Sequence, residues 1–423
     1  MSKASVQRQR RDIRIMNADG VCWSIMTGAG EWQFVLFALA LGLSEVVSGL
    51  VATIPVLAGA ILQLLTPWGV RHVGSIRHWV TGCAAVQAVS LLGLSAAAIV
   101  GAIPVWALYA TIAVYWASGY MTAPPWQTWV TFLVSERLLP RFWVNRSRWI
   151  QGGLGVGLCA GLILQGGEAI GRPLLAFGVV FAIAFAARSA SSVLLSRQSD
   201  PDEELVSNIE TPSFRRITSH FDHHTRTLLL YMLIFFLGVF IVAPFFGPYL
   251  REQLGFEYWQ IMAITVITFV SKVLFLPFVG RMTEQYGPRH VLWIGAFVTG
   301  PAALFWAISD SFYWLLALQL YVGFGWACWE TGSFLLVFDV IPAVKRTPVM
   351  TLYQLALAIM MVVGSLVGAS LLEGIGVDRS GYVAIFAASS AVRILAMAVL
   401  RLSRGTTGSR GDLAQVQEPQ RAP

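Results

Sequence analysis

Long apolar stretches with almost no charge constrain this sequence more than any other feature. Windows of twenty or more mostly apolar residues recur along the whole chain, separated by short segments that carry charge, proline or glycine. Only 12% of the 423 residues are charged, against about 25% in a typical soluble domain. This is too little charge to cover a surface that faces water. We therefore exclude a soluble globular protein and expect a membrane protein.

The apolar stretches predict helices rather than barrel strands. A helix needs about 20 apolar residues to cross a bilayer, whereas a barrel strand shows about 10 residues of alternating polarity. The stretches here do not alternate, so we expect an all-α membrane protein. Pro124 and Pro125 should kink or end the fourth helix, because neither ring nitrogen can donate the helical hydrogen bond. Twelve membrane-spanning helices are predicted, over residues 20–43, 45–66, 79–101, 104–132, 147–168, 172–195, 226–249, 258–280, 289–308, 313–338, 349–373 and 381–402.

The basic residues predict how the chain is oriented in the membrane. Of the 29 Lys and Arg residues, 23 fall in the two tails, in loops after even-numbered spans, or within two residues of these segments. Only Arg172, Arg251 and Arg379 fall in the opposite loops. Cytoplasmic loops are enriched in Lys and Arg, so we expect a multi-pass protein of the bacterial inner membrane with both termini in the cytoplasm. The net charge of +7 then reflects contact with anionic lipid and no nucleic-acid partner.

A polar segment in the middle of the chain divides it into two sets of six spans. The sequence YWASGY at 115–120 corresponds to YVGFGW 206 positions later, which indicates an internal duplication of the kind common in secondary transporters. We expect two pseudo-symmetric six-helix bundles. The predicted organisation is a basic cytoplasmic tail (1–19), an N-terminal bundle (20–195), a cytoplasmic linker (196–225), a C-terminal bundle (226–404) and a disordered tail (405–423).

Two loops resemble the gating-loop motif of the major facilitator superfamily of secondary transporters. After the eighth span, GRMTEQYGPR keeps the two glycines, the acid and the last base of the family pattern, as Gly280, Gly287, Glu284 and Arg289. The copy after the second span is weaker: it has Pro67, Gly69 and Gly74, but Arg71 stands where the pattern has the acid. The markers of the drug-antiporter, sugar-porter and oligopeptide-transporter subfamilies are absent, so the resemblance indicates a superfamily and no particular substrate.

Three charged residues stand alone inside the predicted spans and are the main candidates for function. A charge at the centre of a bilayer costs about 2.5 to 3.5 kcal/mol on insertion scales. Glu31 lies midway along the first span with no obvious cationic partner. Lys272 and Glu330 each lie eight residues from the cytoplasmic end of their spans, a depth of about 12 Å, so an ion pair between them is expected. Arg188 and Arg393 are weaker candidates, because long side chains near a helix end can reach the interface.

The resemblance implies that spans one, four, seven and ten surround a central cavity. It places Glu31 and Glu330 there, with Glu31 as the preferred protonation site and Lys272 with Glu330 as a substrate clamp or a pair broken on switching. Thr268, Trp116, Tyr120 and Trp326 are further candidates for lining the cavity. A structural ion pair, a glutamate bonded to neighbouring hydroxyls, and lipid-facing or packed rings are the alternative interpretations of the same residues.

Small-residue spacing and histidines complete the set of motifs. Glycines at every fourth position let helices approach closely, either for packing or for a rocking motion; they are Gly153, Gly157, Gly161, Gly364 and Gly368. The histidines His220, His223 and His224 are interpreted as a solvated patch in the linker and not as a metal site. No Walker loop is present, so we expect no ATP-driven step and no cofactor.

The sequence as a whole predicts a transporter and not an enzyme. We expect a monomeric secondary transporter, symporter or antiporter, that moves a small solute by alternating access and is driven by protons. The alternative is a transporter-like membrane sensor or assembly factor that binds a solute without moving it.

Overall fold

The computed structural model describes residues 3–135, 138–200, 223–341 and 343–402. These residues are helical throughout, with turns between helices and no strand among them. The expected linker residues 201–222, with His220, and the expected C-terminal tail lie outside the described residues. The all-α prediction is therefore confirmed for the part of the chain that the structure describes.

The N-terminal half is built from helices that lie over the six predicted spans, although α1 and α8 begin earlier than predicted. The first predicted span is divided into three segments, because the regular helix stops at Ala29 and resumes at Phe34. The helices of the N-terminal half are α1 (Lys3–Ala29), η1 (Glu31–Gln33), α2 (Phe34–Ala40), α3 (Glu45–Leu50), α4 (Ile54–Leu62), η2 (Gln63–Leu65), α5 (Thr66–Val73), α6 (Ile76–Val100), α7 (Val105–Leu133), α8 (Leu139–Leu158), α9 (Ala160–Ala169) and α10 (Pro173–Ser196).

The C-terminal half repeats this arrangement. Its helices are α13 (His223–Val242), η3 (Ala243–Phe245), α14 (Phe246–Pro248), η4 (Tyr249–Gln253), α15 (Tyr258–Tyr286), α16 (Pro288–Thr299), η5 (Pro301–Ala307), α17 (Phe312–Val340), α18 (Ala343–Ile375) and α19 (Arg379–Leu402). The chain also differs from the predicted boundaries at its start, since α1 begins at Lys3 and residues 3–19 are helical rather than a separate tail.

Nine helical segments of the described residues are long and apolar enough to cross a membrane. They coincide with nine of the predicted spans. The other three predicted spans are helical as well, as α1 with α2, as α7 and as α17, but they contain more glycine, aromatic and polar residues and fall outside the nine. The count of twelve spans and the cytoplasmic termini stay predictions.

The two prolines of α7 do not end the helix. α7 continues through Pro124 and Pro125 to Leu133. A proline at 125 leaves the carbonyl of Met121, four residues earlier, without its helical donor. The indole Nε1 of Trp79 donates to this oxygen at 3.2 Å. A neighbouring helix therefore supplies the hydrogen bond that the ring removes, and of the two expected outcomes, a kink or an end, the helix does not end here.

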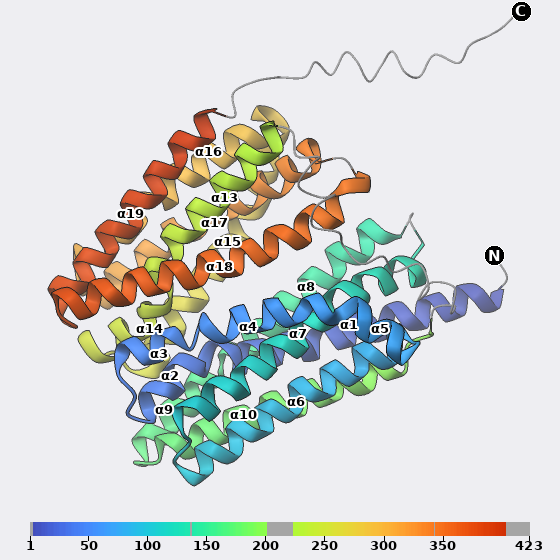
Figure 1. Cartoon of the computed structure of the whole chain (residues 1–423), viewed down its shortest axis with the longest axis horizontal. Coiled ribbons are helices and arrows are strands. Elements are labelled where there is room, and N and C mark those ends of the chain that lie inside the picture. Colours follow the sequence, from blue (N-terminus) through green and yellow to red (C-terminus); the bar gives the residue numbers. More distant parts are fainter. Residues whose placement is uncertain (1–2, 136–137, 201–222, 342, 403–423) are drawn as a thin grey trace, which may run out of the picture.

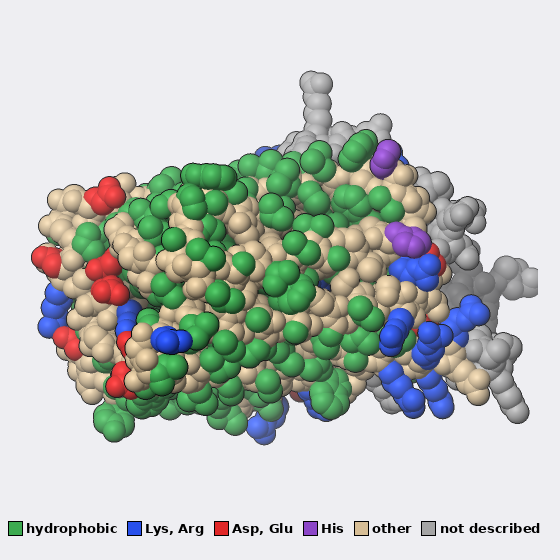
Figure 2. All heavy atoms as spheres, turned by 90° about the horizontal axis from the view of Figure 1, so that it is seen from below, with side chains coloured by type: hydrophobic (Ala, Val, Ile, Leu, Met, Phe, Trp, Pro, Cys, Tyr) green, Lys and Arg blue, Asp and Glu red, His purple; other side chains and the backbone are tan. Residues whose placement is uncertain are grey.

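The two halves form two bundles that meet at one end of the molecule. Figure 1 shows them close together at the end opposite the N-terminus and diverging toward the end that carries it. We call the end with the N-terminus the terminal face and the other end the opposite face. Contacts between the bundles join α4 and α3 to α18, α9 to α15, and α2 to α14. Apolar side chains cover the middle of the molecule, and most of the visible basic side chains gather at the terminal face (Figure 2).

Candidate functional site

Glu31 lies at the break between α1 and α2, and its carboxylate has a buried neutral partner. The hydroxyl of Tyr115 on α7 donates to Glu31 Oε1 at 2.6 Å. Tyr115 is fully buried, and its hydroxyl also lies 2.8 Å from the sulfur of Met26. The end of the regular helix at Ala29 places the carboxylate against α7 instead of in lipid.

Glu31 has no ion pair with a basic residue among the described residues, but a buried arginine lies at longer range. Arg188 on α10 lies within electrostatic range of both Glu31 and Tyr115. Arg188 is only 2% exposed, so it also does not reach the membrane interface as expected. The same correction applies to Arg393, which is 5% exposed. Sequence position gives the depth of these arginines, but the packing of the neighbouring helices decides which way they turn.

Lys272 and Glu330 form the ion pair that their matched depth predicts. Lys272 Nζ lies 2.7 Å from Glu330 Oε1 and joins α15 to α17. The Glu330 side chain is 48% exposed and that of Lys272 is 21% exposed, so the pair is accessible from outside the protein. The ammonium group also lies 5.5 Å from the ring centre of Phe269, one turn away on the same helix.

Aromatic rings connect this ion pair to the region around Glu31. Phe269 makes an edge-to-face contact with Trp32, at 5.5 Å between ring centres, and Trp32 directly follows Glu31. Gln33 contacts the sulfur of Met262 on α15 at 3.5 Å. The segment that carries Glu31 is therefore in contact with the α15 face that carries Lys272, across the boundary between the two bundles.

The remaining predicted lining residues are divided between two locations. Trp116 and Tyr120 pack together on α7 at 5.7 Å between ring centres, and the indole nitrogen of Trp116 is buried without a partner among the described residues. Trp326 packs in the C-terminal bundle against Phe235, Phe236 and Trp329. The hydroxyl of Thr268 donates to Ile264 O in its own helix and does not bond to Lys272.

The two predicted gating loops form tight turns at equivalent places. Gly74 ends α5 with a φ of +71°, and Gly287 ends α15 with a φ of +82°. Only glycine adopts such values at low cost, which explains the glycine at this position in both copies. Gly69 lies against Trp79, whereas Gly280 has open space around it. Pro67 lies in the first turn of α5, Glu284 lies near the end of α15, and Arg289 follows Pro288 at the start of α16.

A buried charge cluster near the terminal face was missed by sequence reasoning. Asp19 on α1 pairs with Arg146 on α8 at 3.2 Å, and both side chains are at least 94% buried. Asp19 is the last residue of the predicted basic tail (1–19) and is not among the predicted site residues. The sequence does contain a signal for this cluster. Asp19 directly precedes the first predicted span, and a carboxylate at this position can compensate an arginine such as Arg188 inside a span.

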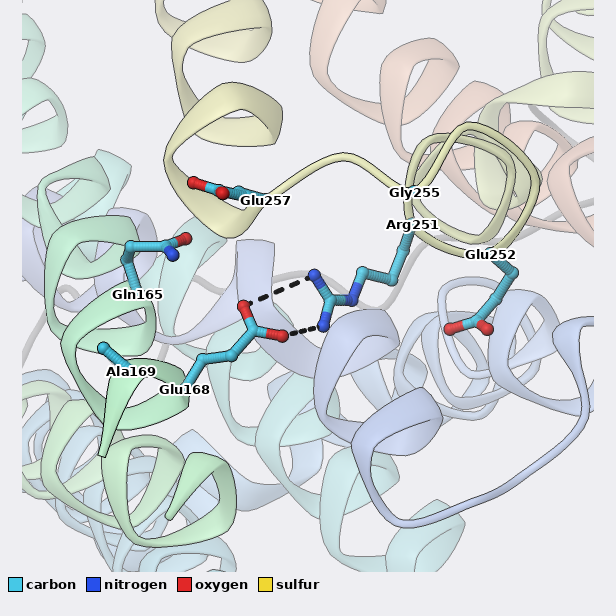
Figure 3. Close-up of a pocket in the computed structure, with 7 residues that line it drawn as sticks. All are labelled: Gln165, Glu168, Ala169, Arg251, Glu252, Gly255 and Glu257. Atoms are coloured by element: carbon cyan, nitrogen blue, oxygen red, sulfur yellow. Dashed lines mark hydrogen bonds and ion pairs between the residues drawn. The ribbon is translucent and has the colours of Figure 1, made fainter. Parts of the chain in front are cut away.

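A second cluster joins the two bundles at the opposite face. Glu168, at the end of α9, pairs with Arg251 in η4 (Figure 3). Glu45 on α3 accepts hydrogen bonds from Gln253 and from Tyr382 of α19. Glu168 and Arg251 line a surface cavity of about 500 Å³ with Gln165, Glu252 and Glu257. None of these contacts was predicted, because each joins segments far apart in the sequence.

No metal site is apparent in the described part of the chain. Its His, Cys, Asp and Glu side chains form no group of three or more that could hold a metal ion. His223 and His224 lie at the start of α13 with their rings 5.9 Å apart.

Comparison with known proteins supports a transporter family. Residues 228–421 match the family model described as Major Facilitator Superfamily. No curated protein sequence matches the chain.

Solved transporter structures share the fold over most of the chain. A mutant form of the nucleoside transporter NupG is 13% identical with a TM-score of 0.69, covering 92% of this chain and 99% of its own. A POT family transporter in complex with 5-aminolevulinic acid is 11% identical with a TM-score of 0.71, covering 93% and 97%. A bacterial homologue of the human lysosomal transporter Spinster, in an inward-facing and unoccupied conformation, is 13% identical with a TM-score of 0.67, covering 96% and 100%.

The match of the C-terminal half, on a fold that both halves share with these transporters, identifies the class as a multi-pass membrane transport protein and not an enzyme. Residues 228–421 are thus similar to the major facilitator superfamily.

Proposed function

We propose that the protein is a secondary active transporter that moves a small solute by alternating access between two six-helix bundles, driven by protons. In this proposal it has twelve spans, works as a monomer in the bacterial inner membrane and has its terminal face in the cytoplasm. Glu31 carries the proton, and Lys272 with Glu330 holds the solute.

The single observation that best supports this proposal is the set of contacts between the bundles at the level of Glu31. Glu31, Trp32, Phe269 and Lys272 follow one another across the boundary, through the ring contact of 5.5 Å. Protonation of Glu31 therefore changes the charge next to the boundary between the two bundles, where movement must occur when the bundles rock. Charges inside a membrane are costly and typically mark substrate or ion pathways.

The contacts at the opposite face support an inward-facing state. The bundles are joined there by Glu168 with Arg251 and by Glu45 with Tyr382, while the accessible Glu330 lies nearer the terminal face. We infer that the solute leaves or enters from the cytoplasm in this state. Such a state is also that of the similar Spinster homologue and of a bacterial homologue of the iron transporter ferroportin.

The proposal is tested by flux through the purified protein in liposomes. A thermal-shift screen with nucleosides, dipeptides, 5-aminolevulinic acid and Fe²⁺ identifies a ligand, and its uptake is then measured under an imposed proton gradient. We expect uptake that follows the gradient in the natural protein and is lost in Glu31→Gln. Glu373→Gln, an exposed carboxylate at the end of α18, is the matched control and should transport normally.

Two outcomes would contradict the proposal. Gradient-driven uptake that is unchanged in Glu31→Gln would remove Glu31 from proton coupling. A ligand that binds but is not moved under any imposed ion gradient would favour the sensor alternative.

A further inference from the structure

The strongest unexplained feature is a cluster of buried charges that joins three helices. It lies between Glu31 and the terminal face. Asp19 on α1, Arg146 on α8 and Arg188 on α10 are 3%, 5% and 2% exposed. Burying one unpaired ion costs several kcal/mol, so such a cluster requires a balance of charge. Arg146 is well compensated: it pairs with Asp19 Oδ2, donates to Met16 O and lies 4.4 Å above the ring of Trp126.

Arg188 is compensated much less well within this cluster. Its Nη1 donates to the hydroxyl of Ser191 at 2.8 Å, and Ser191 in turn donates to Asp19 Oδ1 at 2.6 Å. Its Nε is buried without a partner among the described residues. Arg188 therefore reaches Asp19 only through a neutral hydroxyl, while Asp19 is already paired with Arg146.

The carboxylate of Glu31 supplies the charge that the cluster lacks. Arg188 is within electrostatic range of Asp19, Tyr115 and Glu31, and also of Cys83 on α6. With Glu31 ionised, the two arginines are balanced by two carboxylates. With Glu31 protonated, the same buried set carries one uncompensated positive charge.

We propose that Arg188 is a positioning residue whose counter-ion alternates between Glu31 and Asp19. When Glu31 takes up a proton, Arg188 shifts toward Asp19 and competes with Arg146 for that carboxylate. This loosens the ion pair that holds α8 to α1. The proposal rests on the proposed proton site at Glu31 and adds the step by which a change of charge there reaches the packing of the helices.

The C-terminal bundle provides a matched control. Arg393 on α19 lies 205 positions after Arg188, close to the offset that relates the two halves, and is 5% exposed. It donates to the carbonyl of Thr299 at 3.1 Å, and its Nε is also without a partner among the described residues. Unlike Arg188, it has no carboxylate within electrostatic range in the described part of the chain.

The test is a double-mutant cycle on thermal stability, which needs no substrate. The natural protein, Glu31→Gln, Arg188→Gln and the double variant are purified in lipid nanodiscs and melted at pH 8 and at pH 5. At pH 8 we expect each single variant to lose about 5 °C or more in Tm, because one buried charge loses its partner. The double variant should melt higher than the less stable single variant. At pH 5 the penalty of Arg188→Gln should shrink, because protonation of Glu31 removes the negative charge that Arg188 balances.

Controls separate this role from ordinary packing. Arg188→Lys retains the charge and should retain the dependence of Tm on pH. The cycle of Glu31→Gln with Arg393→Gln should be additive at both pH values. Additive effects for Arg188 as well, or equal coupling for Arg393, would overturn the proposal.

The outcome also distinguishes this proposal from the proposed function. Coupling between Glu31 and Arg188 without any effect of Glu31→Gln on flux would retain the charge pair and reject proton transport through Glu31. Loss of flux in Glu31→Gln with additive stabilities would reject only the role of Arg188.

Discussion

The two central carboxylates have partners of different kinds, which suits them to different roles. Glu31 accepts from the neutral hydroxyl of Tyr115, with Arg188 held at longer range. Glu330 contacts the ammonium group of Lys272 directly and is far more accessible. A group that exchanges a proton requires a neutral form that its surroundings tolerate, whereas a clamp requires a fixed charge that a solute can reach.

The Lys272–Glu330 pair should matter for solute binding more than for stability. Because Glu330 is 48% exposed, the pair contributes about 1 kcal/mol or less to folding. We expect Lys272→Met and Glu330→Gln each to change the Tm little and to abolish binding of the solute found in the screen. Ligand-induced thermal shift measures both effects, and a large loss of Tm with normal binding would make the pair structural.

At the scale of helices, glycines decide how closely α1 and α8 pack. A Cβ at Gly157 would lie 2.5 Å from the carbonyl oxygen of Ile25, and one at Gly28 would lie 2.6 Å from that of Leu154. In the C-terminal bundle, a Cβ at Gly368 would overlap the carbonyl oxygen of Ile241. The backbones of the two helices are in contact at these glycines. Adding even one methyl group there would therefore push the helices apart.

Gly157→Ala should therefore destabilise the N-terminal bundle, while Gly155→Ala should not. The methyl group at 157 forces α8 away from α1 at a cost of about 1 to 3 kcal/mol. Gly155 lies on the same helix with no atom near its missing Cβ, so alanine there is neutral or slightly stabilising. Melting of both variants in detergent provides the comparison, and equal stability would mean that the α1–α8 contact is loose.

At the scale of the whole molecule, contacts at the opposite face hold the two bundles together. Besides the ion pair of Glu168 with Arg251, the hydroxyls of Thr53 and Ser365 lie 2.7 Å apart, with both residues buried. Phe177 of the N-terminal bundle packs against Tyr258 of the other at 5.8 Å between ring centres. These contacts must break if the opposite face is to open during transport.

A disulfide at this place should lock the transporter. In a variant in which Cys22, Cys83, Cys159 and Cys328 are replaced by Ser, we expect Thr53→Cys with Ser365→Cys to cross-link on oxidation. Flux should then stop and should return when a reductant is added. Either cysteine alone is the control and should transport under both conditions. Continued flux through the fully cross-linked protein would show that this contact does not open.

Much of the architecture could be predicted because it depends on position along the chain. The apolar stretches gave helices at the predicted places, and equal depth correctly paired Lys272 with Glu330. The spacing of Gly153 and Gly157 correctly indicated a close helix contact. The sequence did not indicate that α7 continues through Pro124 and Pro125, since the compensating donor, Trp79, is 42 residues away in sequence from the carbonyl it serves.

Sequence alone thus determined which segments are long, apolar helices and that Lys272 pairs with Glu330, because hydropathy and helical rise act along one axis. The tertiary structure decided which neighbours each charge meets. Arg188 turns inward between Asp19 and Glu31, and Glu168 meets Arg251 across the bundles, because the rotation and packing of helices set these contacts. Depth can be read along a helix, but direction around it is fixed only by the helices packed against it.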